Sequence, residues 1–275
     1  MFSQLSKPLI MGILNVTPDS FSDGGKFSDV SAALKQVERM IIEGVDMIDI
    51  GGESTRPGSK SVSPAEQQQR VIPVIQAIRH TLNSDILLSI DTTSSAVAKA
   101  AIEAGVNIIN DVSAGLEDPE ILKVAAIFQV PIILMHRQGT PKSMQDNPYY
   151  DDVVPEVINT LLKQIEVALH RGIKKENILI DPGIGFGKRK EDNLALLAHL
   201  DQFVALGFPV LLGTSRKRFM GNICNVSEPA ELVTATAVTT ALGVMAGVQL
   251  FRVHDVKENR QAADVAWAIK LKGIT

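Results

Sequence analysis

Several features that would place the chain in a common class of proteins are scarce or missing. The one cysteine, Cys224, cannot form a disulfide within the chain, which fits a reducing compartment. No stretch reaches about 18 uninterrupted apolar residues, and the first residues have no basic segment leading into an apolar run. We therefore expect no membrane span and no secretory leader, and we expect a cytoplasmic protein.

An excess of charge of either sign is also missing. The chain has 27 basic and 31 acidic residues and a formal net charge of −4. This balance argues against nucleic acid or an anionic membrane as a partner, so any anionic ligand must be bound by a local cluster of cations. The sequence has no HExxH motif, no paired cysteine or histidine ligands and no GxSxG turn. Zinc hydrolysis and serine acyl transfer therefore lose their usual support.

What the chain does have is a regular alternation of short apolar runs and longer segments with helical periodicity. The β-rich runs are eight, at residues 9–14, 47–50, 86–90, 107–109, 131–135, 178–180, 209–212 and 249–253. Between them, segments such as 32–42, 153–169 and 193–206 carry apolar residues at the i, i+3, i+4 spacing of a helix. A strand–helix unit repeated in this way indicates a parallel sheet.

The residues expected at helix ends agree with this division. Ser63 and Asp118 each precede a proline that would occupy the first helical position. Glycines stand where helices should end, at Gly44, Gly105, Gly172 and Gly207. No linker or change of composition marks a second domain in the 275 residues, of which 45% are hydrophobic. We predict a single (β/α)8 barrel over residues 1–275, with an open doubly wound sheet as the alternative that alternation alone leaves open.

A polar or glycine-rich group follows nearly every apolar run. These groups are Asn15, residues 51–53, Asp91, Asn110 with Asp111, His136, Asp181, residues 213–215, and Arg252 with His254. In a barrel they would all open into one mouth, where barrel enzymes carry their chemistry. About half of such a set could instead be helix caps or turn formers. That second role suits Asp111, Ser113 and Thr93 best.

One part of this mouth is suited to a polar heterocycle. Asp91, Asn110 and Asp181 offer hydrogen-bond donors and acceptors for amino, ring N–H and carbonyl groups, although structural ion pairing is an alternative for the two carboxylates. The run DPGIGFGK at residues 181–188 fits neither a Walker loop nor a dinucleotide fingerprint, because the required glycine and hydroxyl positions do not match. We expect its glycines to let the backbone approach a flat ligand, with Phe186 either covering that ligand or packing in the ordinary way.

A second part of the mouth is cationic. Arg56, the run from Ser215 to Arg218, and Arg252 with His254 bring cations and hydroxyls to other strand ends. Such groups suit a phosphate or diphosphate, with solvated surface charge as the alternative for Arg216 and Arg218.

Three further residues have open roles at this stage. His254 is the better functional histidine, because it lies two residues after Arg252 and shares its face of the strand. His136 is either functional or structural. Asn15 is either a turn residue or a ligand of Mg²⁺, an ion that needs only one or two protein oxygens when it also binds substrate phosphate.

Seven motifs in order along the chain resemble those of the dihydropteroate synthase family, pterin-binding enzymes of folate synthesis. They are MGILNVTPDSFSDGG (11–25), DIGGESTRPG (49–58), SIDT (89–92), NDVS (110–113), DPGIGFGK (181–188), SRKR (215–218) and RVHDV (252–256). The resemblance implies a (β/α)8 barrel and a transferase that joins 6-hydroxymethyl-7,8-dihydropterin diphosphate to 4-aminobenzoate. The products would be 7,8-dihydropteroate and diphosphate.

The resemblance also implies roles for individual residues. The pterin would be held by Asp91, Asn110, Asp181 and Lys217, with Arg252 against its ring. The diphosphate would be held by Thr55, Arg252 and His254, with Asn15 at Mg²⁺. The 4-aminobenzoate site, where sulfonamides compete in this family, would be lined by Thr55, Pro57, Ser215 and Lys217. Other implied substrate-binding residues are Arg56, Met135, Phe186 and Gly213, and the catalytic residues would be Lys217, Arg252 and His254.

The resemblance further implies a homodimer and two loops, residues 15–27 and 53–62, that close over the substrates. Three departures from the usual pattern, at Arg137, Leu116 and the pair Arg189-Lys190, put local loop contacts in doubt. Two alternatives remain at this stage. A corrinoid-linked methyltransferase would share the pterin site but has no need of a diphosphate cluster, and a non-catalytic pterin-binding protein would have lost turnover.

Overall fold

The computed structural model describes residues 7–17, 25–53, 61–82, 85–140, 143–144 and 146–273, with the side chains of 25–29 left out. Within them, the eight predicted strands are all present and parallel. They are β1 (Leu9–Asn15), β2 (Met47–Gly51), β3 (Leu87–Asp91), β4 (Ile108–Asp111), β5 (Ile132–Met135), β6 (Ile178–Asp181), β7 (Leu211–Leu212) and β8 (Leu250–Val253). The sequence suggested that Asn15, Asp91, Asp111 and Asp181 follow their strands. In the structure each of the four is instead the last residue of its strand, because strand pairing continues through it.

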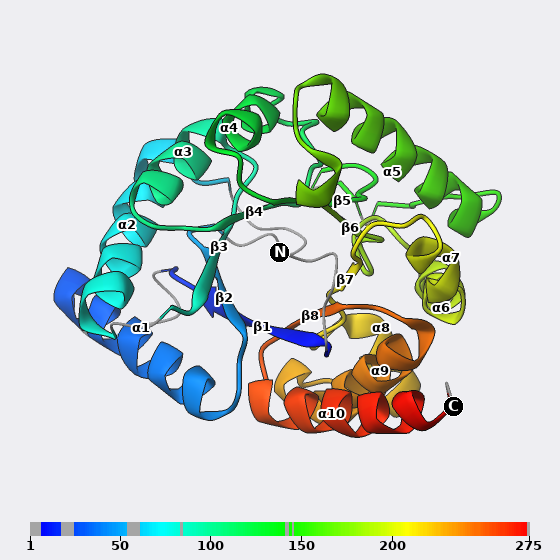
Figure 1. Cartoon of the computed structure of the whole chain (residues 1–275). Coiled ribbons are helices and arrows are strands. Elements are labelled where there is room, and N and C mark those ends of the chain that lie inside the picture. Colours follow the sequence, from blue (N-terminus) through cyan, green and yellow to red (C-terminus); the bar gives the residue numbers. More distant parts are fainter. Residues whose placement is uncertain are drawn as a thin grey trace.

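The sheet closes into a barrel, as predicted, and the open doubly wound alternative is wrong. The strands follow the order β6-β5-β4-β3-β2-β1-β8-β7, so β1 pairs with both β2 and β8. A parallel bridge between Ile180 and Val210 then joins β6 to the start of β7 and completes the ring. Figure 1 shows the barrel along its axis, with the helices arranged around the outside.

The helices alternate with the strands along the chain. They are α1 (Gly25–Ile42), α2 (Pro64–Thr81), α3 (Ser95–Glu103), α4 (Glu120–Phe128), α5 (Val153–His170), α6 (Lys190–Ala198), α7 (Leu200–Val204), α8 (Arg218–Cys224), α9 (Val233–Ala246) and α10 (Val256–Lys272), with short 3-10 turns η2 (Lys175–Asn177) and η3 (Pro229–Glu231). Among the described residues, none of these helices is long and apolar enough to cross a membrane.

Most of the expected helix ends are confirmed. Ser63 Oγ accepts a hydrogen bond from the Glu66 backbone at 3.3 Å, with Pro64 at the first position of α2. The four terminal glycines have positive φ values, from +76° at Gly207 to +115° at Gly105, which a side chain would disfavour. Two expectations are wrong. Pro119 does not take the first helical position of α4, because the helix begins at Glu120 and Pro119 is its N-cap residue. Residues 193–206 form no single helix, because His199 leaves helical geometry at φ −122° and ψ 32° and separates α6 from α7.

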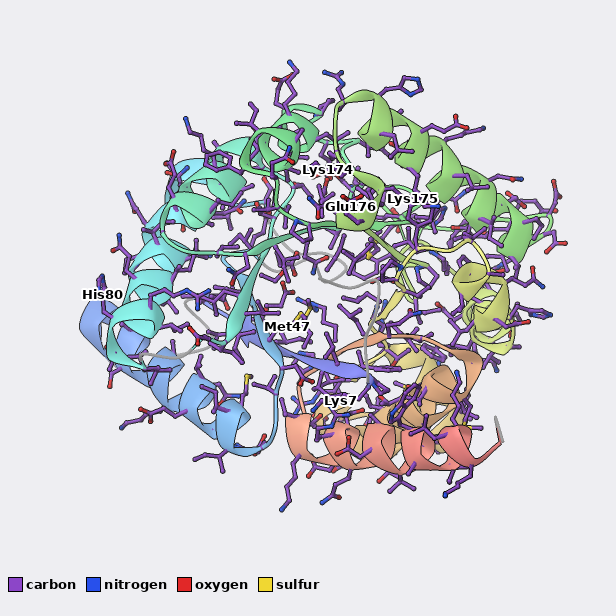
Figure 2. All side chains as sticks on the ribbon, viewed as in Figure 1. Lys7, Met47, His80, Lys174, Lys175 and Glu176 are labelled. Atoms are coloured by element: carbon purple, nitrogen blue, oxygen red, sulfur yellow. The ribbon has the colours of Figure 1, made fainter. Side chains whose placement is uncertain are left out.

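Alternate residues of each strand face opposite sides of the barrel wall, which gives the protein two apolar layers. The larger layer lies between the strands and the helices and includes Ile48, Ile90 and Leu134. The smaller layer fills the lumen at the amino ends of the strands, and Figure 2 shows Met47 pointing into the ring there. We call this smaller layer the floor; it consists of Met11, Met47, Ile108, Ile133, Leu179, Leu211 and Leu250.

Candidate active site

The residues two positions beyond the floor carry most of the polar chemistry of the lumen. Met47 is followed in this phase by Asp49, Ile108 by Asn110, and Leu179 by Asp181. Because residues i and i+2 of a strand share a face, these side chains line the lumen just above the floor. Arg252 stands in the same relation to Leu250. We call this polar layer, at the carboxyl ends of the strands, the mouth.

Arg252 links two carboxylates across the mouth. Its Nε lies 2.6 Å from Asp49 Oδ2, and its Nη2 lies 2.7 Å from Asp91 Oδ2. Asn110 Nδ2 donates to the same Asp49 oxygen at 3.0 Å. The pairing stabilises the charged guanidinium, and the pKa of Arg252 is raised although burial works against the charge. Four strands therefore contribute to one network, in which Arg252 holds two carboxylates in fixed places.

Asp49 is a member of this network that the sequence reasoning missed. Its side chain is fully buried and anchors both Arg252 and Asn110. A signal existed, because Asp49 is a charged residue inside an apolar run and shares the inward phase of Met47. Ser89 on β3 is a second buried polar residue in the inward phase that was missed.

The network leaves hydrogen-bond acceptors unused. Asp49 Oδ1, Asp91 Oδ1 and Ser89 Oγ are buried and have no hydrogen-bond partner within the described part of the chain. Burial raises the pKa of Asp91, while the neighbouring Arg252 opposes the shift. A buried acceptor without a donor is unfavourable in a folded protein. A ligand that reached these atoms with N–H or O–H groups would relieve this cost.

The turn after β6 holds Asp181 in place. Asp181 Oδ1 accepts a hydrogen bond from the Gly183 backbone at 2.7 Å. Gly183 has φ +68°, and a Cβ at this position would lie 1.8 Å from the carbonyl oxygen of His136. A Cβ at Gly187 would lie 2.2 Å from the carbonyl oxygen of Gln138. These glycines thus admit neighbouring protein backbone, whereas the sequence had suggested that they admit a flat ligand.

Lys217 lies beside this turn and over Phe186. Its Nζ is 4.4 Å from the centre of the Phe186 ring and donates to the carbonyl oxygen of Ile184. Burial lowers the pKa of Lys217 to about 8, with Asp181 opposing the shift and Arg252 adding to it. Gly185 makes room for the lysine stem, since a Cβ there would lie 2.8 Å from Lys217 Cδ. In this structure, the Phe186 ring therefore packs against the Lys217 ammonium.

Ser215 and His254 form a pair next to Arg252. The hydroxyl of Ser215 lies 2.9 Å from His254 Nδ1 and accepts a hydrogen bond from the His254 backbone at 3.1 Å. These two contacts fix the imidazole beside the end of β8. Arg216 is instead paired with Asp255, with Nη2 and Oδ1 2.6 Å apart. Arg216 is therefore a structural tie to the start of α10 rather than a solvated surface charge.

Comparisons with known proteins agree with this geometry. The profile of the family described as "Pterin binding enzyme" matches residues 11–254. The dihydropteroate synthase of Synechocystis is 45% identical over 98% of this chain and 92% of its own length. The chain belongs to the dihydropteroate synthase family of pterin-binding enzymes, which are transferases of folate synthesis.

Two solved structures of dihydropteroate synthases have the same fold. The Clostridium difficile enzyme, determined in the presence of pteroic acid, has a TM-score of 0.91 and 42% identity, covering 98% of this chain and 99% of that one. The Xanthomonas albilineans enzyme with 4-aminobenzoic acid has a TM-score of 0.89 and 45% identity, covering 96% and 94%. Membership in this family leaves the corrinoid-linked methyltransferase without support.

Most residues assigned through the family resemblance converge in the mouth. Met135 ends β5, and its Cγ would lie 3.3 Å from a Cβ at Gly183. A Cβ at Gly213 would lie 3.9 Å from both Arg252 Cβ and Asp181 Oδ2. Other predicted residues, Thr55, Arg56 and Pro57, lie outside the described residues, as does most of the two loops at 15–27 and 53–62.

Asn15 ends β1 beside the mouth. In register it pairs with Gly51, and Gly51 in turn pairs with Asp91. The amide oxygen of Asn15 would lie 3.7 Å from a Cβ at Gly51. In the described ranges, no group of three or more histidine, cysteine or carboxylate side chains is placed to hold a metal.

Two residues whose roles were open in the sequence have clear contacts. His136 Nδ1 lies 2.9 Å from Lys188 Nζ, and burial together with the Lys188 charge lowers the pKa of His136 to about 3. His136 is therefore neutral and packed, as a structural histidine would be. Asp111 accepts hydrogen bonds from Ser113 and Gly115, at 2.6 to 2.8 Å, so it forms the turn expected of it.

The residues that depart from the family pattern make contacts outside the mouth. Arg137 forms an ion pair with Glu117. Arg189 pairs with Asp192 at 2.7 Å and lies 5.3 Å from the centre of the Tyr149 ring. Leu116 is exposed. Within the described part of the chain, Arg137 and Arg189 bind these partners and not Asp49, Asp91 or Arg252 of the mouth.

Proposed function

We propose that the residues of the mouth carry the dihydropteroate synthase reaction in this chain, with a pterin end and a diphosphate end that meet at Arg252. The observation that carries the proposal is a set of buried acceptors that have no partner among the described residues and lie beside a cationic strand end. A ligand with N–H donors at one end and anionic oxygens at the other is complementary to this arrangement.

At the pterin end, Asp91 and Asp181 would accept hydrogen bonds from the amino and ring N–H groups. Asp91 has one oxygen held by Arg252, which leaves Oδ1 as the acceptor without a partner among the described residues. Asn110 and Lys217 would bind the remaining edge of the heterocycle, with Arg252 against its face. Met135, Phe186 and Gly213 would line the same space. Pteroic acid with the Clostridium difficile relative supports a pterin as the ligand.

At the diphosphate end, Arg252 and His254 would hold the leaving group, together with Thr55. The Ser215 contact with Nδ1 orients the imidazole for this role. Asn15 would hold Mg²⁺, because a single amide oxygen at the strand end suits an ion that takes most of its ligands from water and phosphate. Bound there, the ion would neutralise charge on the departing diphosphate.

The reaction needs positioning more than a strong base. The bond between the pterin methylene carbon and the diphosphate oxygen breaks, and its electron pair leaves with the oxygen. The amine nitrogen of 4-aminobenzoate forms the new bond to this carbon and loses a proton to solvent. Arg252 and His254 would stabilise the negative charge on the oxygen. Ser215 and Lys217, with Thr55, Arg56 and Pro57, would place the amine, since 4-aminobenzoic acid is bound by the Xanthomonas relative.

An activity assay tests this proposal directly. Purified protein with Mg²⁺, the pterin diphosphate and 4-aminobenzoate should release diphosphate and form 7,8-dihydropteroate in equal amounts. A sulfonamide should compete with 4-aminobenzoate. Folded protein that forms no dihydropteroate under these conditions would refute the proposed function and would leave the non-catalytic pterin-binding alternative.

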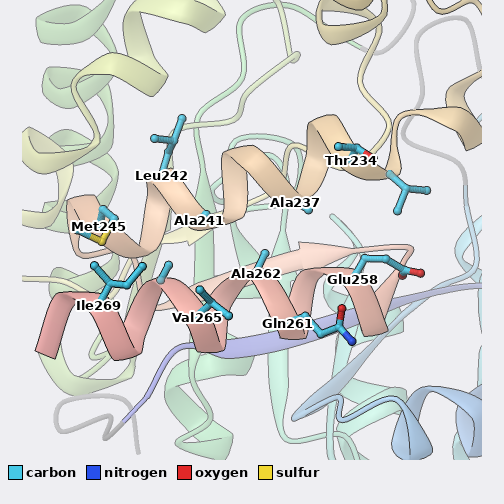
Figure 3. A pocket seen from close by; sticks show the side chains of 12 residues that line it. Thr234, Ala237, Ala241, Leu242, Met245, Glu258, Gln261, Ala262, Val265 and Ile269 are labelled. Atoms are coloured by element: carbon cyan, nitrogen blue, oxygen red, sulfur yellow. The ribbon is translucent and has the colours of Figure 1, made fainter. Parts of the chain in front are cut away.

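We also propose that residues 1–275 act as one cytoplasmic domain that pairs with a second copy. An apolar groove of about 640 Å³ lies between α9 and α10, and Figure 3 shows side chains of both helices lining it. Large side chains, such as Leu242 at 62% exposure, stand beside small ones such as Ala237 and Ala262. A face with both ridges and hollows can pack against a copy of itself around a two-fold axis.

Sedimentation equilibrium tests the pairing. We expect the wild type to behave as a dimer and Leu242→Glu to behave as a monomer, because the new carboxylate would be buried in the interface. Ile127→Glu is the matched control, since Ile127 is an exposed apolar residue on α4, away from the groove. A monomeric wild type would refute the dimer and leave the assignment of the mouth unaffected.

A further inference from the structure

Lys188 is a buried cation to which the roles above assign no task. Its side chain is only 3% exposed. The Nζ lies 2.9 Å from His136 Nδ1, and it donates to the carbonyl oxygen of Gly183 at 2.9 Å and to that of Phe186 at 3.1 Å. Three acceptors match the three N–H groups of an ammonium. Lys188 is thus fully hydrogen-bonded, with neutral groups alone, in the interior of the protein.

Keeping a charge at this position is costly. Burial lowers the pKa of Lys188 to about 7, and the nearby carboxylate of Asp181 opposes the shift. An apolar side chain would avoid the cost of burying the charge, but it would leave the Lys188 contacts of Gly183 and Phe186 unmade. The benefit of a lysine at this buried position is therefore its hydrogen bonds to the turn that contains Gly183 and Phe186.

The turn that Lys188 closes contacts two residues of the pterin end, Asp181 and Lys217. The Gly183 backbone N–H binds Asp181 Oδ1, while the Gly183 carbonyl oxygen accepts from both Lys188 and the Phe186 backbone. The Phe186 ring lies under Lys217, and the Phe186 carbonyl also accepts from Lys188. One ammonium thus fixes both ends of the segment that orients Asp181 and supports Lys217.

Lys188 also joins this turn to the neighbouring strand end. His136 follows β5, and its backbone N–H donates to the Asp181 carbonyl oxygen at 2.9 Å. Its imidazole accepts from Lys188 through Nδ1, which puts the proton of the neutral ring on Nε2. The carboxyl ends of β5 and β6 are therefore tied together both by backbone and through Lys188.

We propose that Lys188 is a positioning residue for the pterin end of the site, which it serves by holding residues 183–187 so that Asp181 and Lys217 keep their places in the mouth. The identity of the ligand in this inference rests on the proposed function. Lys188 itself reaches no reacting atom. Its removal should therefore weaken pterin binding, which uses both Asp181 and Lys217, more than 4-aminobenzoate binding, which uses Lys217 alone of the two.

The variant Lys188→Met removes the ammonium and keeps most of the stem. We expect it to raise the Kd for the pterin diphosphate, measured by calorimetry, by about tenfold or more, because hydrogen bonds from a charged donor are lost behind the binding residues. The KM for the pterin diphosphate should rise similarly, whereas the KM for 4-aminobenzoate should rise less, because only Lys217 of the two supported residues is assigned to that site.

Two controls separate positioning from stability. Lys190→Met removes an exposed lysine two residues further on, and it should leave every parameter unchanged. Phe203→Leu disturbs the core at α7 and should lower the Tm without altering the Kd for the pterin diphosphate. If Lys188→Met lowers the Tm as Phe203→Leu does but binds the pterin diphosphate like the wild type, Lys188 is structural only and the inference is wrong.

A measurement on the wild type guards against a variant that does not fold. Binding of the pterin diphosphate should slow amide hydrogen exchange in a peptide that covers residues 183–188. Unchanged exchange in a protein that binds the ligand would overturn the role of Lys188 and leave the proposed function intact. A wild type that does not bind the pterin diphosphate at all would refute the proposed function, and the inference with it.

Discussion

The floor and the mouth of the barrel are built on the same strands, with residues only two positions apart, yet they have opposite chemistry. The floor is entirely apolar and buried, as at Leu179 and Leu250. In the mouth, Asp181 and Arg252 occupy the next inward positions, and two neighbouring carboxylates have oxygens without partners in the described part of the chain. One layer thus closes the barrel, and the other keeps polar groups ready for a ligand at some cost to stability.

Strand β6 contains both layers within four residues. Leu179 belongs to the floor, and Asp181 belongs to the mouth. Both side chains face the lumen from the same strand, so a change at either position affects the interior of the barrel and not the layer between strands and helices. Substitutions at these two positions therefore compare the two layers directly.

The largest effect on stability is expected in the floor. Leu179→Ala should lower the free energy of unfolding by about 2–5 kcal/mol, because it removes a buried side chain and leaves a cavity in the closed lumen. Urea denaturation measures this change. The folded fraction should keep a kcat/KM within about twofold of the wild type. A much lower kcat/KM in fully folded protein would show that the floor contributes to the reaction, and the contrast between the layers would fail.

A smaller effect, on binding rather than on stability, is expected in the mouth. Asp181→Asn keeps the shape of the side chain and an oxygen for the Gly183 N–H, but it turns one acceptor into a donor. We expect the Kd for the pterin diphosphate to rise by about 100-fold, which corresponds to about 2.7 kcal/mol. Burial raises the pKa of Asp181, so the neutral amide relieves a cost and stability should change little. Asp91→Asn should act in the same direction. Unchanged binding by calorimetry would contradict the assigned role of Asp181.

The sequence predicted the barrel and the strand ends well, because short apolar runs, helical periodicity and the residues at helix ends are local signals. It could not show which polar residues are joined. Asp49 pairs with Arg252 although 203 positions separate them in the chain. Phe186 was expected to cover the ligand or to pack in the ordinary way, whereas the turn of residues 183–187 places its ring against Lys217. Lys188 is the last residue of the DPGIGFGK motif, but nothing in the sequence indicated that it is buried or that it contacts His136. Such contacts arise only when separate strand ends meet.

The pH dependence of stability offers a third comparison, since the floor has no titratable group and any such dependence must arise elsewhere. His136 lies at the carboxyl end of β5, and its pKa is lowered from 6.5 to about 3. Between these values the unfolded chain binds a proton that the folded protein does not bind, so stability falls as the pH falls. The slope from one such group reaches about 1.4 kcal/mol per pH unit.

His136→Asn should remove this dependence while keeping an acceptor near Lys188. Between about pH 7 and about pH 5, the wild type should lose about 2 kcal/mol of stability more than His136→Asn does, as measured by urea denaturation at each pH. His170→Asn, at an exposed histidine of α5, should follow the wild-type curve. Parallel curves for the wild type and His136→Asn would mean that His136 has the same pKa in the folded protein as in the unfolded chain, so that it is protonated at pH 5. The Lys188 ammonium could not then donate to Nδ1, and the tie between the ends of β5 and β6 would need a different proton arrangement.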